Sequence, residues 1–508
     1  MYRSALYLKY IPPGILAISL ALIYLASMAP GLTWANSGSD GGDLIAAAAT
    51  GGVAHPSGYP LFLLLAQFFQ LLPFGSLAFR TNLMSAIATV LAAVLVYGLV
   101  TRVFVTFNCA GYWLAGLVSG YAFGLSPLIW SQAVITEVYA LHALFVVFIL
   151  YLSTSSVPPP MQKRLDCLRG LALGLAMGNH VTIIILIPVI LLATVVNQRN
   201  PVETLHQPRE LFWRNWRLDW RCLLRQSAGL GAGLLIYLIL PLRALSHPPV
   251  NWGNPISLGR LWWLVSGQLY QDRLLHWTIW EIWGRLQAWA SLLLQQFGLL
   301  GLMAGLIGLV VFFTPSRLYF ITLWTMVTFS AFAVSYSSVD SYVYLIPAFI
   351  SFAIWIGLGT GSLMEAASRA RRWHSFGRVI SLGLIIYLLG RSVYHWPQVD
   401  ASHDLRAENF GKEVLAAAPT DAIVFAQGDR AVFTMWYFHF ALQKRPDIAV
   451  LATDLLHFDW YQAVLRSVYP SLVLPEPPPW PGRVAAANPQ RPVCYVQYSQ
   501  QAEINCGR

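Results

Sequence analysis

Residues 30–61 read PGLTWANSGSDGGDLIAAAATGGVAHPSGYPL and directly follow an apolar run that is long enough to cross a membrane. Asp40 and Asp43 lie among glycines, and the segment ends on the motif HPSGYP at residues 55–60. Carboxylates this close to a membrane span are costly to keep, so they indicate a function. We interpret the segment as a catalytic loop in which Asp40 or Asp43 accepts a proton or orients a substrate. The alternative is a solvated loop in which Asp40 only caps a helix that begins near Leu44.

The composition excludes a soluble enzyme. Of the 508 residues, 57% are hydrophobic and only 11% are charged, whereas soluble domains carry about 25% charged residues. The apolar residues form repeated blocks of about 17 residues or more, each long enough to cross hydrocarbon as a helix. The formal charge of +10 comes mostly from Arg and Lys between these blocks, where they orient a membrane protein. No pattern of an RNA- or DNA-binding module is present, so we expect no nucleic-acid partner.

The apolar blocks predict about eleven membrane helices in a multi-pass protein. We expect the first block, residues 11–29, to be a retained helix, although residues 27–29 resemble a signal-peptidase site. Residues 59–72 are short and bracketed by prolines, which favours a helix lying along the membrane surface. The Arg clusters place the amino terminus, Arg214 and Arg371 in the cytoplasm, and the loop of Asp40 and the carboxyl terminus outside it.

One apolar stretch, residues 170–196, does not fit a single crossing. A single helix would carry the Arg-rich segment 199–225 to the outside, against the positive-inside rule. We therefore predict two short helices with a break at residues 178–180, Gly-Asn-His, because such residues occur where irregular backbone lines a cavity. His180 then lies on the same side as Asp40, either as a turn residue bonded to backbone or as a substrate contact.

Two further outer loops carry candidate site residues. Glu137 stands near the start of a returning helix, where an acid facing the helix dipole is common; the alternative is a second catalytic acid. Residues 246–283 are rich in Trp, Tyr, Gly and Asn, which is typical of helices half-buried at a membrane interface. Within them, Arg260 and Arg273 have the fork geometry that pairs with a phosphate.

The composition changes near residue 394, and the remaining residues predict a small soluble α/β domain. A strand, a helix and a second strand follow one another in the pattern of a parallel βαβ unit. Residues 428–430, Gly-Asp-Arg, stand at the end of the first strand, where such folds often place ligand contacts, although a structural turn explains them as well. The predicted strands and helix cover residues 422–427, 431–442 and 448–453.

The five cysteines form no metal-binding motif. Cys494 and Cys506 lie close together in the tail, and an oxidising compartment would allow them to form a disulfide. The spacing permits the bond and does not demand it.

Three segments resemble one known family. Residues 40–87 (DGGDLIAAAATGGVAHPSGYPLFLLLAQFFQLLPFGSLAFRTNLMSAI) resemble the first outer loop of polyprenyl-phosphate-sugar-dependent glycosyltransferases of the GT-C class. Residues 126–152 (SPLIWSQAVITEVYALHALFVVFILYL) are similar to their third and fourth helices. The tail segment 404–437 (DLRAENFGKEVLAAAPTDAIVFAQGDRAVFTMWY) is similar to a subgroup related to protein O-mannosyltransferases.

The resemblance implies a fold class and a division of the chain. We expect an α-helical polytopic membrane protein of the GT-C type, with about eleven transmembrane helices, interfacial helices and a small soluble α/β domain. The membrane domain covers residues 1–393, with its catalytic outer loop at 30–80, and the extracytoplasmic α/β domain covers 394–508.

The resemblance also implies roles for individual residues. Asp40 matches the acid of the first-loop motif, and Asp43 its acidic companion. Glu137 falls near the acid of the second outer loop. His180 falls where many relatives carry a Thr-Lys pair, which puts a phosphate-binding lysine in doubt. The element after the acids, with Ser-Gly in place of Pro-Gly, supplies the substrate-binding residues His55, Ser57 and Tyr59.

The chemistry implied is transfer of a sugar, with mannose as a candidate in this subgroup, from a polyprenyl phosphate in the membrane to a hydroxyl of a protein, lipid or glycan. Asp40 or Asp43 acts as the base and the anomeric centre inverts. The leaving phosphate is bound by Arg260, Arg273 or His180. A divalent metal is left open. We expect substitutions of the loop acids to leave folding intact, because exposed loop changes usually cost less than about half a kcal/mol.

Two other classes of function compete with this prediction. A transporter or flippase of a polar or lipid-linked substrate explains the many spans and the helix broken at residues 178–180. Against it, no inverted repeat is evident and the acids lie in outer loops. A membrane scaffold with a sensing tail leaves Asp40, Asp43 and His55 unexplained.

Overall fold

The computed structural model describes residues 2–105, 111–155, 157–192, 194, 219–274, 278–311, 317–369, 375–475 and 480–507. Arg214 and Arg371, which the sequence places in the cytoplasm, lie outside these ranges.

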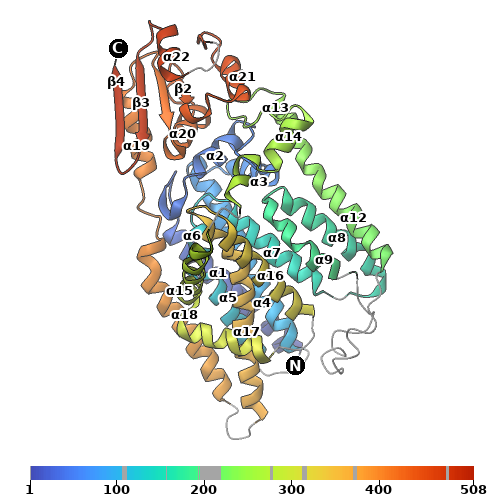
Figure 1. The fold of residues 1–508 in the computed structure, drawn as a ribbon. Coiled ribbons are helices and arrows are strands. Elements are labelled where there is room, and N and C mark those ends of the chain that lie inside the picture. The colour runs from blue at the N-terminus through green and yellow to red at the C-terminus, as the bar shows by residue number, and fades with distance from the viewer. Residues whose placement is uncertain are drawn as a thin grey trace.

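Long apolar helices build the larger part of the molecule (Figure 1). Seven described helices are long and apolar enough to cross a membrane, or up to eight if the pair α5–α6, bent by 69°, is one span. Three shorter apolar helices, Pro60–Gln70, Tyr139–Ser153 and Val181–Leu192, accompany them. The multi-pass membrane protein is confirmed, whereas the number eleven stays a prediction. The described helices of this part are α1 (Tyr2–Ser27), η1 (Ala35–Ser37), α2 (Gly41–Ala49), α3 (Pro60–Gln70), α4 (Leu77–Val105), α5 (Tyr112–Gly124), α6 (Pro127–Ala133), α7 (Tyr139–Ser153), α8 (Pro159–Met177), η2 (Val181–Leu186), α9 (Ile187–Leu192), α12 (Trp220–Leu234), η3 (Leu235–Leu238), α13 (Ile239–Ala244), α14 (Leu258–Val265), η4 (Gln268–Arg273), α15 (Ile279–Val311), α16 (Arg317–Ser335), η5 (Ser341–Leu345), α17 (Ile346–Arg369) and α18 (Phe376–Val399).

The predicted break at residues 178–180 is confirmed, because α8 ends at Met177 and η2 begins at Val181. Close packing of α8 against α12 holds the helix before the break in place. A Cβ on Gly170 would lie 1.9 Å from the carbonyl oxygen of Gln226. Only glycine therefore allows the two backbones to approach this closely, and the end of α8 is fixed where it delivers His180.

The tail forms a four-stranded sheet in the order β2-β1-β3-β4. Strand β1 pairs in parallel with β2 and with β3, and β4 is antiparallel to β3. The predicted parallel βαβ unit is thus confirmed. The division predicted at residues 393–394 lies inside α18, which continues to Val399. The tail elements are α19 (Arg406–Ala417), β1 (Ile423–Gln427), α20 (Asp429–Trp436), η6 (Tyr437–Ala441), β2 (Ala449–Ala452), η7 (Thr453–Leu455), α21 (Asp459–Val468), α22 (Pro481–Ala487), β3 (Val493–Tyr498) and β4 (Ala502–Gly507).

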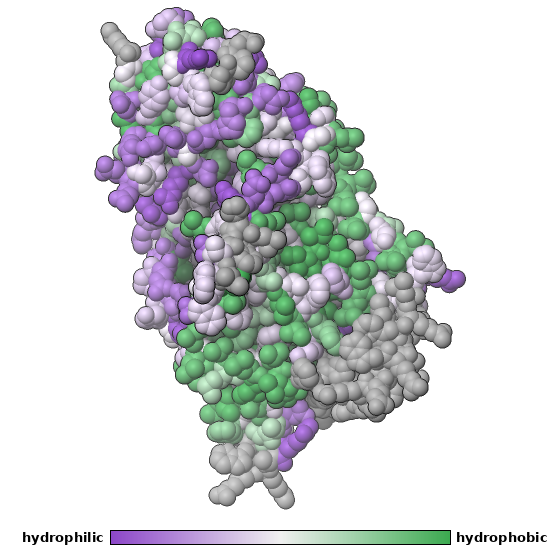
Figure 2. Space-filling model, in the orientation of Figure 1, coloured by the Kyte–Doolittle hydropathy of each residue, from purple (hydrophilic) through white to green (hydrophobic). Residues whose placement is uncertain are grey.

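The first loop and the tail share one hydrophobic core. Helix α2 packs on α20, and a Cβ on Gly42 would lie 2.4 Å from the carbonyl oxygen of Phe433. Asp404 of the tail accepts hydrogen bonds from the Thr33 hydroxyl (2.7 Å) and the Trp34 amide (2.9 Å). Apolar side chains of α2, α3 and the sheet belong to a single buried cluster. The surface is hydrophilic over the tail and hydrophobic over the membrane helices (Figure 2), so the tail is seated on the end of the membrane part.

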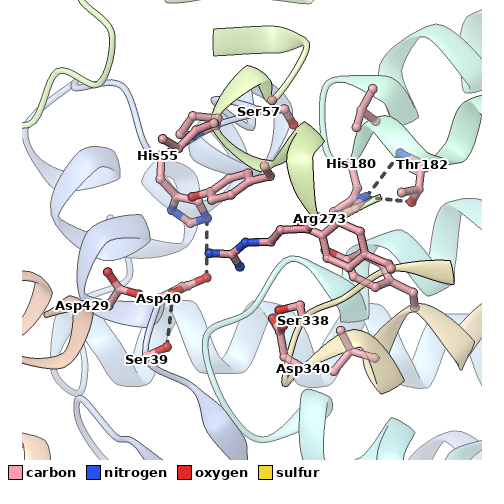
Figure 3. A pocket seen from close by; sticks show the side chains of 18 of the residues that line it. Ser39, Asp40, His55, Ser57, His180, Thr182, Arg273, Ser338, Asp340 and Asp429 are labelled. Carbon is pink, nitrogen blue, oxygen red and sulfur yellow. Dashed lines mark hydrogen bonds and ion pairs between the residues drawn. The ribbon is translucent and has the colours of Figure 1, made fainter. Parts of the chain in front are cut away.

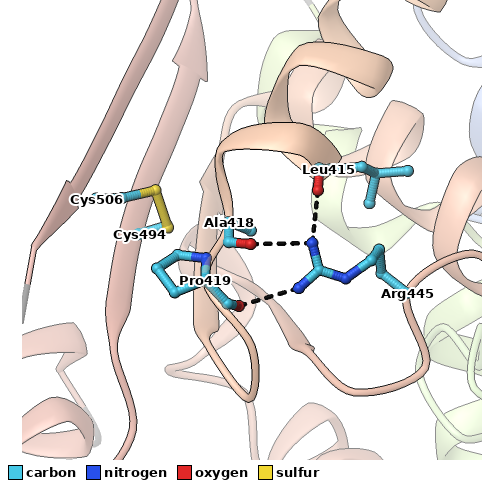
Figure 4. The surroundings of a disulfide bond; sticks show 6 residues. All are labelled: Leu415, Ala418, Pro419, Arg445, Cys494 and Cys506. Atoms are coloured by element: carbon cyan, nitrogen blue, oxygen red, sulfur yellow. Dashed lines mark hydrogen bonds between the residues drawn. A yellow bond between two sulfur atoms is a disulfide. The ribbon is translucent and has the colours of Figure 1, made fainter.

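Cys494 and Cys506 form a disulfide between neighbouring positions of β3 and β4 (Figure 4). The same view shows Arg445, whose guanidinium donates to the carbonyl oxygens of Leu415, Ala418 and Pro419 and fixes the turn before β1. The pairing that the spacing permitted is therefore present, and it ties the edge strand β4 to the sheet.

Removing this disulfide is expected to destabilise the tail by about 3 kcal/mol, because the bond closes a short loop in the unfolded chain. The Cys494→Ala/Cys506→Ala double variant should lower the Tm and expose the tail to protease. Cys167→Ala, which removes an exposed free thiol, is the matched control. Reaction of all five cysteines of the chain with an alkylating reagent in the unreduced, unfolded protein, in place of the three outside the bond, would contradict the disulfide.

Candidate functional site

A cavity of about 1030 Å³ opens where the first loop, the ends of the membrane helices and the tail meet. Its walls come from residues 36–59, from the segment between α6 and α7, from the break after α8, from η4 and from residues 336–344. The tail closes one side with residues of α20 and of the loop after β2. Figure 3 shows its polar centre. Of the predicted site residues, it is lined by Asp40, His55, Ser57, Tyr59, Glu137, His180 and Arg273.

Asp43 lies behind the cavity wall and is fully buried. One carboxylate oxygen accepts the backbone N–H of His55 (3.0 Å) and contacts its Nδ1 (2.7 Å). The other oxygen accepts the indole N–H of Trp252 (3.0 Å). Such a carboxylate cannot reach a substrate, but it fixes the ring orientation of His55. The expectation that the acids lie in an exposed loop is wrong for Asp43, because the loop is covered by the tail.

His55 presents its other ring nitrogen to the cavity. Nε2 lies 3.2 Å from the Tyr59 hydroxyl and 3.5 Å from Oδ2 of Asp40. Burial lowers the pKa of His55, but the negative charges of Asp40 and Asp43 outweigh burial and raise it to about 9. At neutral pH the ring is therefore a cation held between two carboxyl groups.

Asp40 faces the cavity at the start of α2. Its side chain makes no capping hydrogen bond to the helix, so the alternative of a simple cap is wrong. The Ser39 hydroxyl donates to Oδ1 (3.2 Å). Burial raises the pKa of Asp40, and the charge of His55 opposes that rise. The side chain is 35% exposed, and this exposed part looks into the cavity. Asp40 is thus the accessible member of the row of contacting side chains Asp43, His55 and Asp40.

Glu137 lies in the cavity wall and is 6% exposed. It precedes the N-cap residue Val138 of α7, so it does not stand in the first helical turn as one alternative held. Burial, and then the charge of Asp40, raise the pKa of Glu137 well above its ordinary value. Both effects favour the neutral form of this carboxyl group.

His180 is the turn residue bonded to backbone that one of its two predicted roles describes. Its side chain caps η2 by accepting the N–H of Thr182, and the residue also lines the cavity. The rings of Tyr59, Tyr139 and His142 surround it at centroid distances of 6.2, 5.7 and 5.1 Å.

The two arginines proposed for the phosphate have different surroundings. Arg273 lines the cavity, and its side chain crosses the cavity centre in Figure 3. Its backbone carbonyl accepts the N–H of Ser337 (2.8 Å), which pins η4 to the opposite loop. Arg260 does not line the cavity and instead forms an ion pair with Asp459 (2.8 Å).

Several residues of the site had no predicted role. The indole N–H of Trp252 donates to Asp43. Asp340 directly precedes η5 and lines the cavity. Asp429 and Arg430, for which a structural turn sufficed, line it from the tail side. Among the described residues, no group of three or more His, Cys, Asp and Glu is placed to hold a metal ion.

Comparison with known proteins places the chain in a family context. Residues 40–203 match the protein O-mannosyl-transferase TMEM260 N-terminal domain, and residues 407–482 match TMEM260-associated domain 2. The protein O-mannosyl-transferase TMEM260 of Mus musculus is 25% identical over 470 residues, which cover 86% of this chain and 62% of that protein. The chain is related to the protein O-mannosyltransferases. The Dictyostelium discoideum protein O-mannosyl-transferase is 23% identical over 510 residues, covering 91% of this chain and 59% of that one.

Comparison with solved structures shows the fold of this chain. ArnT from Cupriavidus metallidurans, in the apo state and bound to undecaprenyl phosphate, superposes with a TM-score of 0.57 in both states. The identities are 11% and 12%, with 98% and 95% of this chain and 93% and 92% of ArnT covered. The expected GT-C fold is confirmed. The chain spans about three fifths of the length of the two protein O-mannosyl-transferases.

Proposed function

We propose that the protein transfers a sugar, mannose by analogy with its relatives, from a polyprenyl-phosphate donor to a hydroxyl group of an acceptor protein. The relatives named protein O-mannosyl-transferase support the sugar and the acceptor. The ArnT structure bound to undecaprenyl phosphate supports a lipid phosphate as the carrier. The observation that carries the proposal is the row of three contacting side chains Asp43, His55 and Asp40. This row ends on an accessible carboxyl group in a cavity that is large enough for a sugar and its phosphate.

In the proposed reaction Asp40 is the general base. Its carboxylate takes the proton of the acceptor hydroxyl while the hydroxyl oxygen forms a bond to the anomeric carbon. The bond from that carbon to the phosphate oxygen breaks, and the electron pair leaves with the lipid phosphate. Attack from the face opposite the phosphate inverts the anomeric centre.

His55 and Asp43 keep Asp40 ready for this step. Burial favours the neutral form of Asp40, which cannot act as a base. The charged His55 ring, 3.5 Å away, favours the carboxylate instead. Asp43 holds the ring in place through Nδ1 and favours its charged form. Asp43 is therefore a positioning residue in this mechanism, and Asp40 is the catalytic one.

The donor's phosphate is placed on the side of Arg273 and His180. Arg273 is a permanent cation in the cavity, and its guanidinium suits a phosphate. Apolar residues of η2 and α16, among them Ile184, Ile185 and Phe332, continue the cavity lining toward the membrane helices. They offer a path for the polyprenyl tail. We also propose that the cavity and the tail lie outside the cytoplasm and the amino terminus inside it, as the Arg clusters predict.

The direct test uses purified protein, a polyprenyl-phosphate mannose with a labelled sugar and a hydroxyl-bearing acceptor peptide. We expect labelled peptide and free polyprenyl phosphate in equal amounts. Asp459→Asn, which changes an exposed carboxylate outside the cavity, should act like wild type. A parallel assay with a chelator decides whether a divalent metal takes part. Movement of intact donor across a vesicle membrane without sugar release would replace the proposal with a flippase.

A further inference from the structure

His180 is a buried imidazole in the cavity wall, 6% exposed, at the break between α8 and η2. Besides the rings named above, Tyr344 packs on it at 5.8 Å. In Figure 3 the Arg273 side chain runs between the two groups, with His180 and Thr182 near one end and His55 and Asp40 near its guanidinium end. The His180 imidazole is therefore separate from the proposed base, Asp40. It lies on the side of the cavity on which the proposed reaction places the leaving phosphate.

Thr182 contacts Nδ1 of this ring twice. Its backbone N–H donates to Nδ1 (3.4 Å), and its side-chain oxygen lies 2.8 Å from the same nitrogen. A backbone N–H is only a donor, so Nδ1 must be the acceptor and carry no proton. The threonine hydroxyl then donates to Nδ1 as well. In the neutral ring the one proton is left on Nε2.

The His180 ring is neutral near neutral pH. His180 lies in a turn outside the helices, where burial, and then the charge of His55, lower its pKa to about 4. A neutral imidazole with an occupied Nδ1 has a single donor, the Nε2–H group. It adds a hydrogen bond for an anion without adding a cation to the site.

An additional donor suits the phosphate, because the cavity is rich in acids. Asp40, Glu137, Asp340 and Asp429 line it, whereas Arg273 and Arg430 are the permanent cations among its described lining residues. The phosphate gains negative charge as its bond to the sugar breaks. A fixed N–H donor aimed at that charge stabilises the transition state more than the ground state.

We propose that Thr182 is a positioning residue that locks His180 in the Nε2-protonated tautomer, so that the ring donates a hydrogen bond to the phosphate of the lipid-linked sugar. The inference rests on the proposed function. It adds a residue that shares no motif with the acids of the first loop, and it explains how this chain binds phosphate without a lysine at the break.

The test compares two substitutions of each residue. Thr182→Val removes the hydroxyl at nearly constant shape and should lower kcat/KM for the donor about three- to tenfold, the value of one neutral hydrogen bond. Thr182→Ser keeps the hydroxyl and should lose less. His180→Gln places an amide N–H near the position of Nε2 and should retain more turnover than His180→Ala. The KM for the acceptor should stay unchanged in all four.

A spectroscopic measurement separates positioning from folding. In protein labelled with 15N-histidine, His180 should show the Nε2-protonated tautomer, and Thr182→Val should shift it toward a mixture. Thr154→Val, which removes a hydroxyl bonded to a helix carbonyl away from the cavity, is the matched control. An unchanged tautomer in Thr182→Val, or unchanged kcat/KM with a changed tautomer, would overturn the inference while the transferase stands. Absence of transfer by wild type would instead remove the proposed function.

Discussion

Asp40→Asn is expected to lower turnover about a hundredfold to ten-thousandfold, the usual cost of removing a general base. The asparagine keeps the size and shape of the side chain but cannot accept the proton of the acceptor hydroxyl. The side chain faces the cavity and caps no helix, so the fold should survive the change. The measurement is transfer of labelled sugar to the acceptor peptide, normalised to folded protein.

Asp459→Asn again serves as the control for Asp40→Asn, because it removes the same charge from an exposed site beside Arg260. Near-normal turnover of Asp40→Asn would exclude it as the base. The role would then pass to His55, whose Nε2 faces the cavity and whose Nδ1 is held by Asp43. A rate that rises with pH through the titration of a histidine would accompany that outcome.

Asp43→Asn is expected to affect stability and turnover together. The buried carboxylate accepts three hydrogen bonds, and breaking a buried pair of this kind costs about 3–5 kcal/mol. The asparagine also turns an N–H donor toward groups that donate to the wild-type carboxylate. Without the charge of Asp43 the pKa of His55 falls, and less of the ring is charged to favour the Asp40 carboxylate. Thermal unfolding and sugar transfer are measured on the same sample.

The loss of stability in Asp43→Asn should depend on pH in a defined direction. The folded pKa of His55 is raised to about 9, above its ordinary value of about 6.5. The stability from this shift is therefore fully present below about pH 6.5 and is lost as the pH rises through about 9. The difference in Tm between wild type and Asp43→Asn should shrink over the same interval. Trp252→Phe, which removes a neutral donor to Asp43, is the control, and an equal pH dependence in it would contradict the assignment.

The sequence contained enough information to predict the membrane helices and the break in one of them. Hydrophobic length identifies spans, and the Arg-rich segment that follows residue 196 rules out a single helix before it. The parallel strands of the tail were predictable for a similar reason, since apolar runs of strand length alternate with a helix. The acids of the first loop stood out because charges near a span are rare.

Patterns of this kind could not predict which residues meet in the site. Trp252 and Asp43 are 209 residues apart, and no local periodicity reports that the indole reaches the carboxylate. Arg260 and Arg273 looked alike as phosphate ligands. Their surroundings differ because they stand on different helices. Arg273 belongs to η4, which is bonded to residue 337 across the cavity, whereas Arg260 is near the start of α14 and pairs with Asp459. The burial of Asp43 depends on the tail, which the sequence places far away.

The contact between Gly42 and Phe433 has a consequence for how such proteins can diversify. The α carbon of the glycine and the main chain of α20 touch, and a methyl group at position 42 would collide with the carbonyl of residue 433. The two pieces meet through backbone, which substitutions elsewhere cannot easily reshape. A graft of another relative's tail onto this membrane part would succeed only if both surfaces were carried over as a matched pair. The chain is divided by composition, but its two parts pack as one unit.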